Sequence, residues 1–506
     1  MSRTNYSMKN LKYTLIGQFS RILISFLSRT IFVIYLNAEY LGLNGLFTNI
    51  LSVLSVAELG IGTAIAYSLY EPLAEKNEKK ISAIIRLYRN AYITIGVWMC
   101  VAGLVSSHFL EFIIRDMPEI PNIKLIYLMY IANSAISYFL SYKRTLIIAD
   151  QKKYIDAIYH DTTFLILNAI QIVVLVFTQN FIAYLGIKII ATFVENLLLS
   201  IKANKLYPFL RFHKKEKLDD ESKSNIIKNV KAMFFHRIGG AVVLGTDNLL
   251  ISKFVGIVSV GIYSNYLLII NTLKIIFAVV FQSVIASIGN FSVTENNTRL
   301  LGLFRTLDFL GYWIYGFSSI ALFNLLNPFI NLWLGDDYTF PARIVLLIVV
   351  NFYIQGQRLS VMTFKEALGL FWYDRYKPIF ESVINLTFSI YLANAYGLSG
   401  VILGTIISTV LTAFWIEPLV LYKYGLKRDI SNYFFRYLKR IFFILVIGVI
   451  TRYLCNLIPG VAIWTFLAKI FICLVIPNIL IVIFFHKTSE FKELYIISRK
   501  FIKYRH

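Results

Sequence analysis

The chain has 506 residues, 58% of them hydrophobic, and a formal net charge of +22. Its mean hydropathy of +0.66 excludes a soluble domain of this size. Only helices and closed barrels satisfy their backbone polar groups in lipid, and the apolar stretches lack the short alternating pattern of barrel strands. The composition therefore predicts an all-α polytopic membrane protein.

Hydropathy and helix-breaking residues predict about fourteen transmembrane helices of the length that the hydrocarbon core requires. The polar start, MSRTNYSMKNLKY, runs directly into the first span, so we expect no cleavable signal peptide. The expected spans are 13–36, 43–70, 88–110, 123–148, 155–178, 181–203, 230–253, 257–288, 304–326, 342–365, 376–396, 399–421, 437–457 and 461–485.

Basic residues are distributed unevenly between the loops that separate these spans. If the N-terminus is cytoplasmic, most of the 50 lysines and arginines fall in inner segments. The outer segments hold only Arg115, Lys124, Lys253, Arg343 and Arg452. This asymmetry predicts that both termini are cytoplasmic, and it explains the positive charge without a nucleic-acid partner.

Two short sequence matches indicate an internal duplication. Lys228-Asn229-Val230-Lys231 echoes Lys9-Asn10-Leu11-Lys12, and Val260-Gly261-Ile262 echoes Leu41-Gly42-Leu43, both at an offset of 219 residues. A repeat with an even number of spans predicts two parallel six-helix lobes. The expected organisation is an N-terminal lobe at 1–203, a cytoplasmic linker at 204–229, a C-terminal lobe at 230–425, and two extra helices with a basic tail at 426–506.

Several cations lie inside the predicted spans. Arg21 and Arg29 are eight residues apart in the first span and share one helix face. A charge at the bilayer centre costs at least about 2.5–3.5 kcal/mol, so it is seldom kept without a use. Together with Lys274 and Arg358, they predict a hydrated cavity that binds phosphate or pyrophosphate. Pairing with buried acids, or snorkelling near span ends, remains the alternative, above all for Lys188, Arg237 and Lys469.

Acidic residues also occur within the spans, foremost Glu58, Glu195 and Asp247. A desolvated carboxylate can exchange protons or bind Na⁺, so these residues are candidates for coupling to an H⁺ or Na⁺ gradient. The alternative is that each carboxylate neutralises a nearby cation. There is no phosphate-binding loop and no histidine spacing typical of a metal site, so we expect no enzyme, no metal and no other cofactor. Asp336-Asp337 fits a helix cap or turn better than a catalytic metal site.

Three segments carry a resemblance to a known family. They are Tyr40–Phe47 (YLGLNGLF), Glu58–Ala64 (ELGIGTA) and Asn327–Tyr338 (NPFINLWLGDDY). They resemble Wzx-type polysaccharide repeat-unit flippases, which are oligosaccharide flippases of the multidrug/oligosaccharidyl-lipid/polysaccharide exporter superfamily. The resemblance extends over the whole chain, including the twin lobes and the two extra helices.

The resemblance implies a V-shaped cavity and alternating access in the bacterial cytoplasmic (inner) membrane. The implied cargo is an undecaprenyl-pyrophosphate-linked oligosaccharide destined for capsule, O-antigen or exopolysaccharide. Arg21 and Arg29 occupy a segment comparable to the first helix of lipid II flippases, where arginines line the cavity, and the last two helices would form a groove for the lipid tail. Implied partners are membrane lipids, a polysaccharide polymerase and chain-length machinery.

The sequence is also compatible with other functions. Within the same superfamily, the cargo could be lipid II or a drug, although a cavity for cationic drugs should be acidic. A membrane glycan polymerase or ligase would need a long external loop with catalytic side chains, and the predicted outer loops are short. A scaffold without transport activity would leave the buried arginines unexplained.

Overall fold

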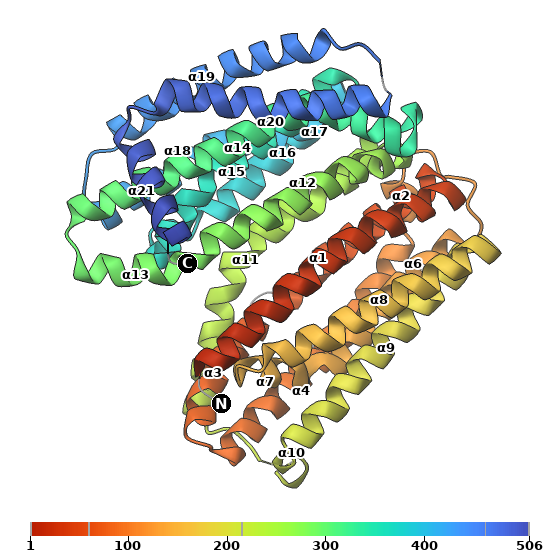
Figure 1. Ribbon diagram of the computed structural model, residues 1–506. Helices are drawn as coiled ribbons and strands as arrows, with labels where there is room; N and C mark the ends of the chain where they lie inside the picture. The colour runs from red at the N-terminus through yellow and green to blue at the C-terminus, as the bar shows by residue number, and fades with distance from the viewer. Residues whose placement is uncertain (1–2, 59–60, 214–215, 461, 504–506) are drawn as a thin grey trace. The chain divides into compact units, whose positions relative to one another are not determined.

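The computed structural model describes residues 3–58, 61–213, 216–460 and 462–503, and no strand occurs in these ranges. The prediction of an all-helical fold is confirmed. The chain divides into two compact units, Met1–Gly261 (unit 1) and Ile262–His506 (unit 2), whose helices are drawn in Figure 1. Helices are labelled α, short 3-10 segments η1 to η4, and a π-helical segment η5.

Unit 1 contains thirteen of these segments. They are α1 (Arg3–Tyr35), α2 (Ala38–Leu54), η1 (Ser55–Glu58), α3 (Ile61–Ala74), α4 (Glu78–Ser107), α5 (Leu110–Ile113), α6 (Ile123–Leu140), η2 (Ser141–Lys143), α7 (Arg144–Ala149), α8 (Lys153–Thr178), α9 (Phe181–Leu206), α10 (Phe209–Phe212) and α11 (Asp220–Phe254). The next helix, α12 (Ile257–Ser283), begins in unit 1 and continues into unit 2.

Unit 2 continues with α13 (Ile285–Thr294), α14 (Asn297–Leu334), η3 (Asp336–Tyr338), α15 (Ala342–Ala367), η4 (Leu370–Trp372), α16 (Lys377–Tyr396), α17 (Leu398–Leu411), α18 (Ala413–Val420), η5 (Leu421–Leu426), α19 (Ser431–Asn456), α20 (Ile463–Phe485) and α21 (Ser489–Lys503).

Within the described ranges, ten helical segments are long and apolar enough to cross a membrane, so this is a multi-pass membrane protein. The remaining predicted spans also coincide with helices, but these helices are broken or more polar. The span expected at 43–70 is divided into α2, η1 and α3, and the others lie in α11, α16 and α19. Leu59 and Gly60, between η1 and α3 in the sequence, lie outside the described residues.

Polar residues define where several helices begin. Asn37 caps α2 by accepting hydrogen bonds from the backbone N–H groups of Glu39 and Tyr40, and Asn180 caps α9 in the same way. Asp219 caps α11 by accepting from the Ser222 N–H at 2.8 Å, and this hydrogen bond lowers the pKa of its carboxyl group. Because α11 begins at Asp220, part of the stretch expected to be a linker is continuous with the seventh predicted span.

The helix α11 packs on α2 within unit 1, and the division into lobes at 204–229 stays a prediction. The contact depends on a small residue, because a Cβ atom on Gly245 would lie 2.7 Å from the Val53 side chain. In unit 2, the long α14 contacts α15, α19, α20 and α21, so the two extra helices cover α14 (Figure 1). Trp313 on α14 donates a 2.7 Å hydrogen bond to Asn478 on α20.

The glycines of the two repeat motifs lie against each other's helices. A Cβ atom on Gly42 would overlap the carbonyl oxygen of Ile257, and one on Gly261 would overlap the carbonyl oxygen of Ala38. Ile257 is also the residue that the 219-residue offset aligns with Ala38. The contact between the first turns of α2 and α12 is therefore reciprocal, as expected for two copies of one ancestral segment.

We predict that Gly42→Ala and Gly261→Ala each destabilise the protein by about 1–3 kcal/mol, because the added methyl group would force two helix backbones apart. Thermal unfolding of the purified chain in detergent would measure this effect. Gly186→Ala on α9 is the matched control, because the nearest atom to its Cβ would be the Met129 methyl at 4.0 Å. The proposed close approach is wrong if all three variants unfold at the temperature of the wild type.

Candidate functional site

Arg21 is held in an ion pair between two neighbouring helices. Its guanidinium pairs with Asp161 on α8 and donates a 2.7 Å hydrogen bond to Gln18, one turn earlier on α1. Gly17 leaves the space that the Asp161 carboxylate occupies. Charge pairing, the alternative that the sequence left open, is therefore the arrangement at Arg21.

Arg29 lies two turns further along α1 in a different environment. The phenol groups of Tyr130 on α6 and Tyr184 on α9 are within electrostatic range of its guanidinium. Lys188, also on α9, places its ammonium 5.3 Å from the centre of the Tyr130 ring. Two cations from different helices therefore act on one aromatic side chain, and the π face of Tyr130 favours the positive charge of Lys188.

Tyr130 and Lys188 belong to the wall of a polar cavity of about 330 Å³ inside unit 1. The same wall contains Glu58, whose carboxylate accepts hydrogen bonds from two further lining residues, Tyr92 at 2.6 Å and Tyr138 at 2.8 Å. The rest of the wall is mostly hydroxyl and amide groups, from Thr48, Asn133, Ser134, Ser137 and Ser141, with Leu51. Such a lining can bind sugar hydroxyls, water or a small ion.

Glu58 ends η1, where the second predicted span breaks into two helices. A helix that ends inside the membrane leaves backbone carbonyls without intrahelical partners, and these carbonyls attract cations. A carboxylate at such a break, with its two oxygens bonded to different tyrosines, is suited to exchange a proton or bind a small cation. The sequence identified Glu58 as a candidate, whereas the two tyrosines and Lys188 emerge only from the structure.

The other candidate acids have different surroundings. Glu195 lies 3.3 Å from Arg144 and 3.1 Å from His160, and Arg144 also pairs with Asp156. Glu195 thus belongs to a charge-paired cluster at one end of unit 1. Asp247 is half-buried on α11, next to Asn248.

In unit 2, Arg358 is part of a balanced network of four charges. It contacts Glu417 at 2.8 Å and Glu381 at 3.5 Å, and Lys377 pairs with the same two carboxylates. Its members come from α15, α16 and α18 and are almost fully buried. The Arg358 charge acts on Lys274 of α12, so the structure brings these two predicted cations near each other. The side chain of Arg237 lies outside the part of the chain that can be described.

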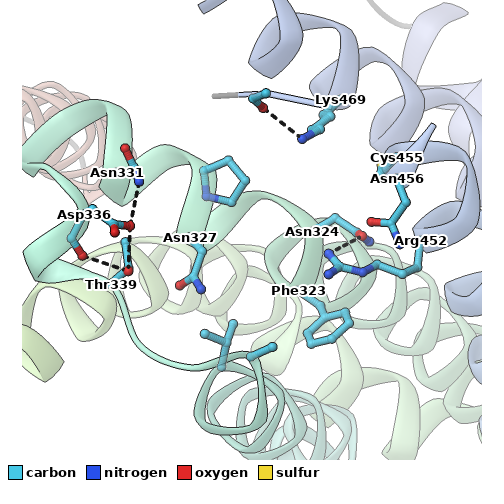
Figure 2. A pocket seen from close by; sticks show the side chains of 14 residues that line it. Phe323, Asn324, Asn327, Asn331, Asp336, Thr339, Arg452, Cys455, Asn456 and Lys469 are labelled. Carbon is cyan, nitrogen blue, oxygen red and sulfur yellow. Dashed lines mark hydrogen bonds between the residues drawn. The ribbon is translucent and has the colours of Figure 1, made fainter. Parts of the chain in front are cut away.

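A pocket of about 320 Å³ in unit 2 contains two further cations (Figure 2). Arg452 and Lys469 come from the extra helices α19 and α20. Arg452 lies 3.5 Å from Asn324 of α14, and the Lys469 ammonium lies 3.4 Å from the Gly460 carbonyl oxygen. We call this the outer pocket, because its helix ends are predicted to face away from the cytoplasm.

The asparagine and aspartate residues of the segment Asn327–Tyr338 shape the wall of the outer pocket. Asn327 donates to the Phe340 carbonyl at 2.7 Å. Figure 2 shows that Asn331 donates to the Asp336 carboxylate, at 2.9 Å. Thr339 also donates to the Asp336 backbone carbonyl at 2.8 Å. These contacts explain the motif as a turn that joins α14 to α15.

Comparison with known proteins places this geometry in a transporter fold. No protein-family model and no curated protein sequence matches the chain. Among solved structures, the lipid II flippase MurJ in an inward closed conformation superposes with a TM-score of 0.68 and 15% sequence identity, covering 94% of this chain and 99% of MurJ. The chain shares the MurJ fold.

Multidrug transporters have the same architecture. An inward-facing MATE family transporter of the MOP superfamily has a TM-score of 0.60 and 14% identity, covering 83% of this chain and 99% of that transporter. A mutant of the Vibrio cholerae MATE transporter VcmN has a TM-score of 0.54 and 14% identity, covering 84% of this chain and 99% of VcmN. At these identities the match establishes the fold, and the cargo must be inferred from the side chains.

We predict that Arg21→Met destabilises the protein by about 3 kcal/mol, because it leaves the Asp161 carboxylate without its partner. The double variant Arg21→Met/Asp161→Leu should recover most of this loss. Thermal unfolding in detergent would measure both effects. Arg299→Met removes the exposed pair with Glu295 and should change stability by only about 0–1 kcal/mol. A double variant as unstable as the single one would contradict this account.

Proposed function

We propose that the protein is a flippase for a polyprenyl-diphosphate-linked oligosaccharide. Transport would proceed by alternating access from the inner to the outer leaflet of a bacterial cytoplasmic membrane, with both termini in the cytoplasm. The product would supply capsule, O-antigen or exopolysaccharide synthesis. A fold shared with a lipid flippase and with drug exporters is compatible with this function but does not select it.

The observation that carries the proposal is the pair of cations beside Tyr130 in unit 1. Arg29 and Lys188 lie within the apolar segments of α1 and α9, where positive charge is seldom kept without a use. An anionic headgroup would interact with both cations, and the adjoining cavity provides hydroxyl and amide groups for sugars. A cavity for cationic drugs would favour carboxylates in place of these cations.

The predicted substrate-binding residues fall into two groups. We propose that Arg29 and Lys274, with Lys188, contact the diphosphate at some stage of transport. Arg21 and Arg358 already face carboxylates, so they would contact an anion only after those ion pairs open. The lipid tail would remain in the bilayer, beside α19 and α20, and the polymerase and chain-length machinery would act on the flipped product.

Lipid II is the second candidate cargo, because the MurJ superposition covers nearly the whole chain, including its C-terminal part. Both candidates join a polyprenyl diphosphate to a glycan, so the same cations could serve either of them. The two lipids differ in their glycan, so the side chains of the polar cavity wall would have to select between them.

We further propose that Glu58 couples transport to an H⁺ or Na⁺ gradient. Its carboxylate lies at the helix break and in the cavity wall, with Tyr92 and Tyr138 as hydrogen-bond donors. Glu195 and Asp247 are weaker candidates, Glu195 because it is already paired with Arg144. Protonation of Glu58 would remove a negative charge from the wall that also contains Lys188.

Vesicles reconstituted with the purified protein would test the cargo. We expect flipping of a fluorescent undecaprenyl-diphosphate oligosaccharide, and Arg29→Ala should slow it at least about tenfold, because a charge-assisted hydrogen bond is worth about 1.5–3 kcal/mol. Arg299→Ala, on an exposed arginine, should flip at the wild-type rate. Selective flipping of lipid II would favour the second candidate, and no flipping of either lipid would overturn the proposal.

The coupling proposal has a separate test. Glu58→Gln keeps the side-chain volume but cannot ionise, so we expect loss of gradient-driven accumulation while downhill flipping continues. Imposed pH and Na⁺ gradients, applied separately, would identify the ion. Glu295→Gln, which removes the carboxylate that pairs with exposed Arg299 of α14, is the control. Gradient-driven transport by Glu58→Gln at the wild-type rate would exclude Glu58 as the coupling residue.

A further inference from the structure

Unit 1 contains a second cavity of about 330 Å³, at the end that the charge distribution predicts to be cytoplasmic. Four cations line it: Arg86 and Arg89 from α4, Lys143 from η2, and Arg211 from α10. We call it the inner basic pocket. Two neighbouring residues of η2 line different cavities: Tyr142 lines the inner basic pocket, and Ser141 lines the cavity that contains Glu58. The segment η2 therefore separates the two cavities.

The lining of the inner basic pocket is strongly basic. Among the residues that the structure describes, it contains no aspartate or glutamate. Glu78 and Glu216 lie 4.0 and 3.6 Å from His213, which also lines the pocket. Arg89 and Arg211 are exposed, so an anion from solution or from a headgroup can reach them. A concentration of positive charge in one wall favours an anion among these side chains.

A buried hydroxyl group gives independent evidence of a ligand. Ser82 lines the pocket with 5% of its surface exposed, and its Oγ has no hydrogen-bond partner. A buried hydroxyl group without a hydrogen-bond partner costs about 1–3 kcal/mol, so the Ser82 hydroxyl indicates that a hydrogen-bond partner is missing from the pocket. A serine within a helix commonly bonds to the preceding turn, but here the hydroxyl remains available to a molecule in the cavity.

The surroundings of Lys143 hold its ammonium in the wall. It donates to Ser200 at 3.0 Å and to Asn204 at 2.8 Å, both on α9. These contacts fix a positive charge that would otherwise extend into water. The pocket therefore combines a fixed ammonium, several guanidinium groups and a hydroxyl donor, which is the donor set that phosphate oxygens require.

We infer that the inner basic pocket binds a phosphate-bearing anion and is a site distinct from the one that contacts the cargo. The phosphate could belong to the headgroup of an anionic phospholipid in the inner leaflet or to a soluble diphosphate, because both present the same oxygens. Arginine forks would contact the phosphate oxygens in pairs, and Ser82 would donate one further hydrogen bond.

The purified full-length protein in detergent provides the test. It would be titrated with inorganic diphosphate and, separately, with short-chain phosphatidylglycerol. Phosphatidylcholine of the same chain length is the control, because its headgroup has no net charge. Saturable binding, followed by thermal shift and native mass spectrometry, is expected and should weaken as salt is added. Binding of phosphatidylglycerol alone identifies a phospholipid site, and binding of diphosphate alone identifies a soluble anion site. Absence of saturable binding in both titrations overturns the inference.

Variants locate the binding to the pocket. Arg89→Gln/Arg211→Gln should raise the dissociation constant at least about tenfold, because it removes two charge-assisted contacts. Lys79→Gln/Lys153→Gln removes the same charge from exposed positions outside the pocket and should bind like the wild type. Equal affinity of the two double variants overturns the inference.

Ser82→Ala tests the pocket independently of any folding defect in the charge variants. It removes only the unpartnered hydroxyl, so the protein should unfold at or above the wild-type temperature while its affinity falls several-fold. Wild-type affinity in Ser82→Ala also overturns the inference. This site lies apart from Arg29 and Glu58, so Ser82→Ala should flip the cargo at the wild-type rate. The flipping assay then tests the proposed function, and the binding assay tests this inference, so that either can fail without the other.

Discussion

The constraint on which this structure depends is the cost of placing charge among apolar helices. Each buried cation needs a carboxylate, a π face, water or a ligand, and the helices are arranged to provide one. Asp161 reaches Arg21 through the space left by Gly17, and Arg440 pairs with Asp308 between α19 and α14. These pairs specify which helices are neighbours, although replacing such a pair by apolar groups need not lower stability.

Two clusters of cations in unit 1 are the sites that we propose for anions. Beside Tyr130, Lys188 faces the aromatic ring, Arg29 is within electrostatic range of the same side chain, and a polar cavity adjoins them. In the inner basic pocket, several cations share a wall without a carboxylate among its described residues. Both arrangements favour anions, but only the first adjoins a helix break with an ionisable side chain, Glu58. We propose that cargo transport depends on the first cluster and the binding of a second anion on the other.

Unit 2 differs in its electrostatics, despite the reciprocal contact that relates α2 to α12. Four of its buried charges form a balanced network around Arg358, and the Arg358 charge also acts on Lys274. Its more open cations, Arg452 and Lys469, come from α19 and α20, which have no counterpart in the predicted six-helix repeat. If the two units arose by duplication, their charge patterns have since diverged.

The sequence alone determined the membrane class, the helical fold and the position of the spans, because hydropathy is a local property of the chain. It also singled out Arg21, Arg29 and Glu58, since a charge inside an apolar segment is visible without any structure. Their partners could not be predicted. Asp161 is 140 residues from Arg21, and Glu417 is 59 residues from Arg358. Which side chains meet depends on the rotation and crossing of packed helices, and only the tertiary structure determines these.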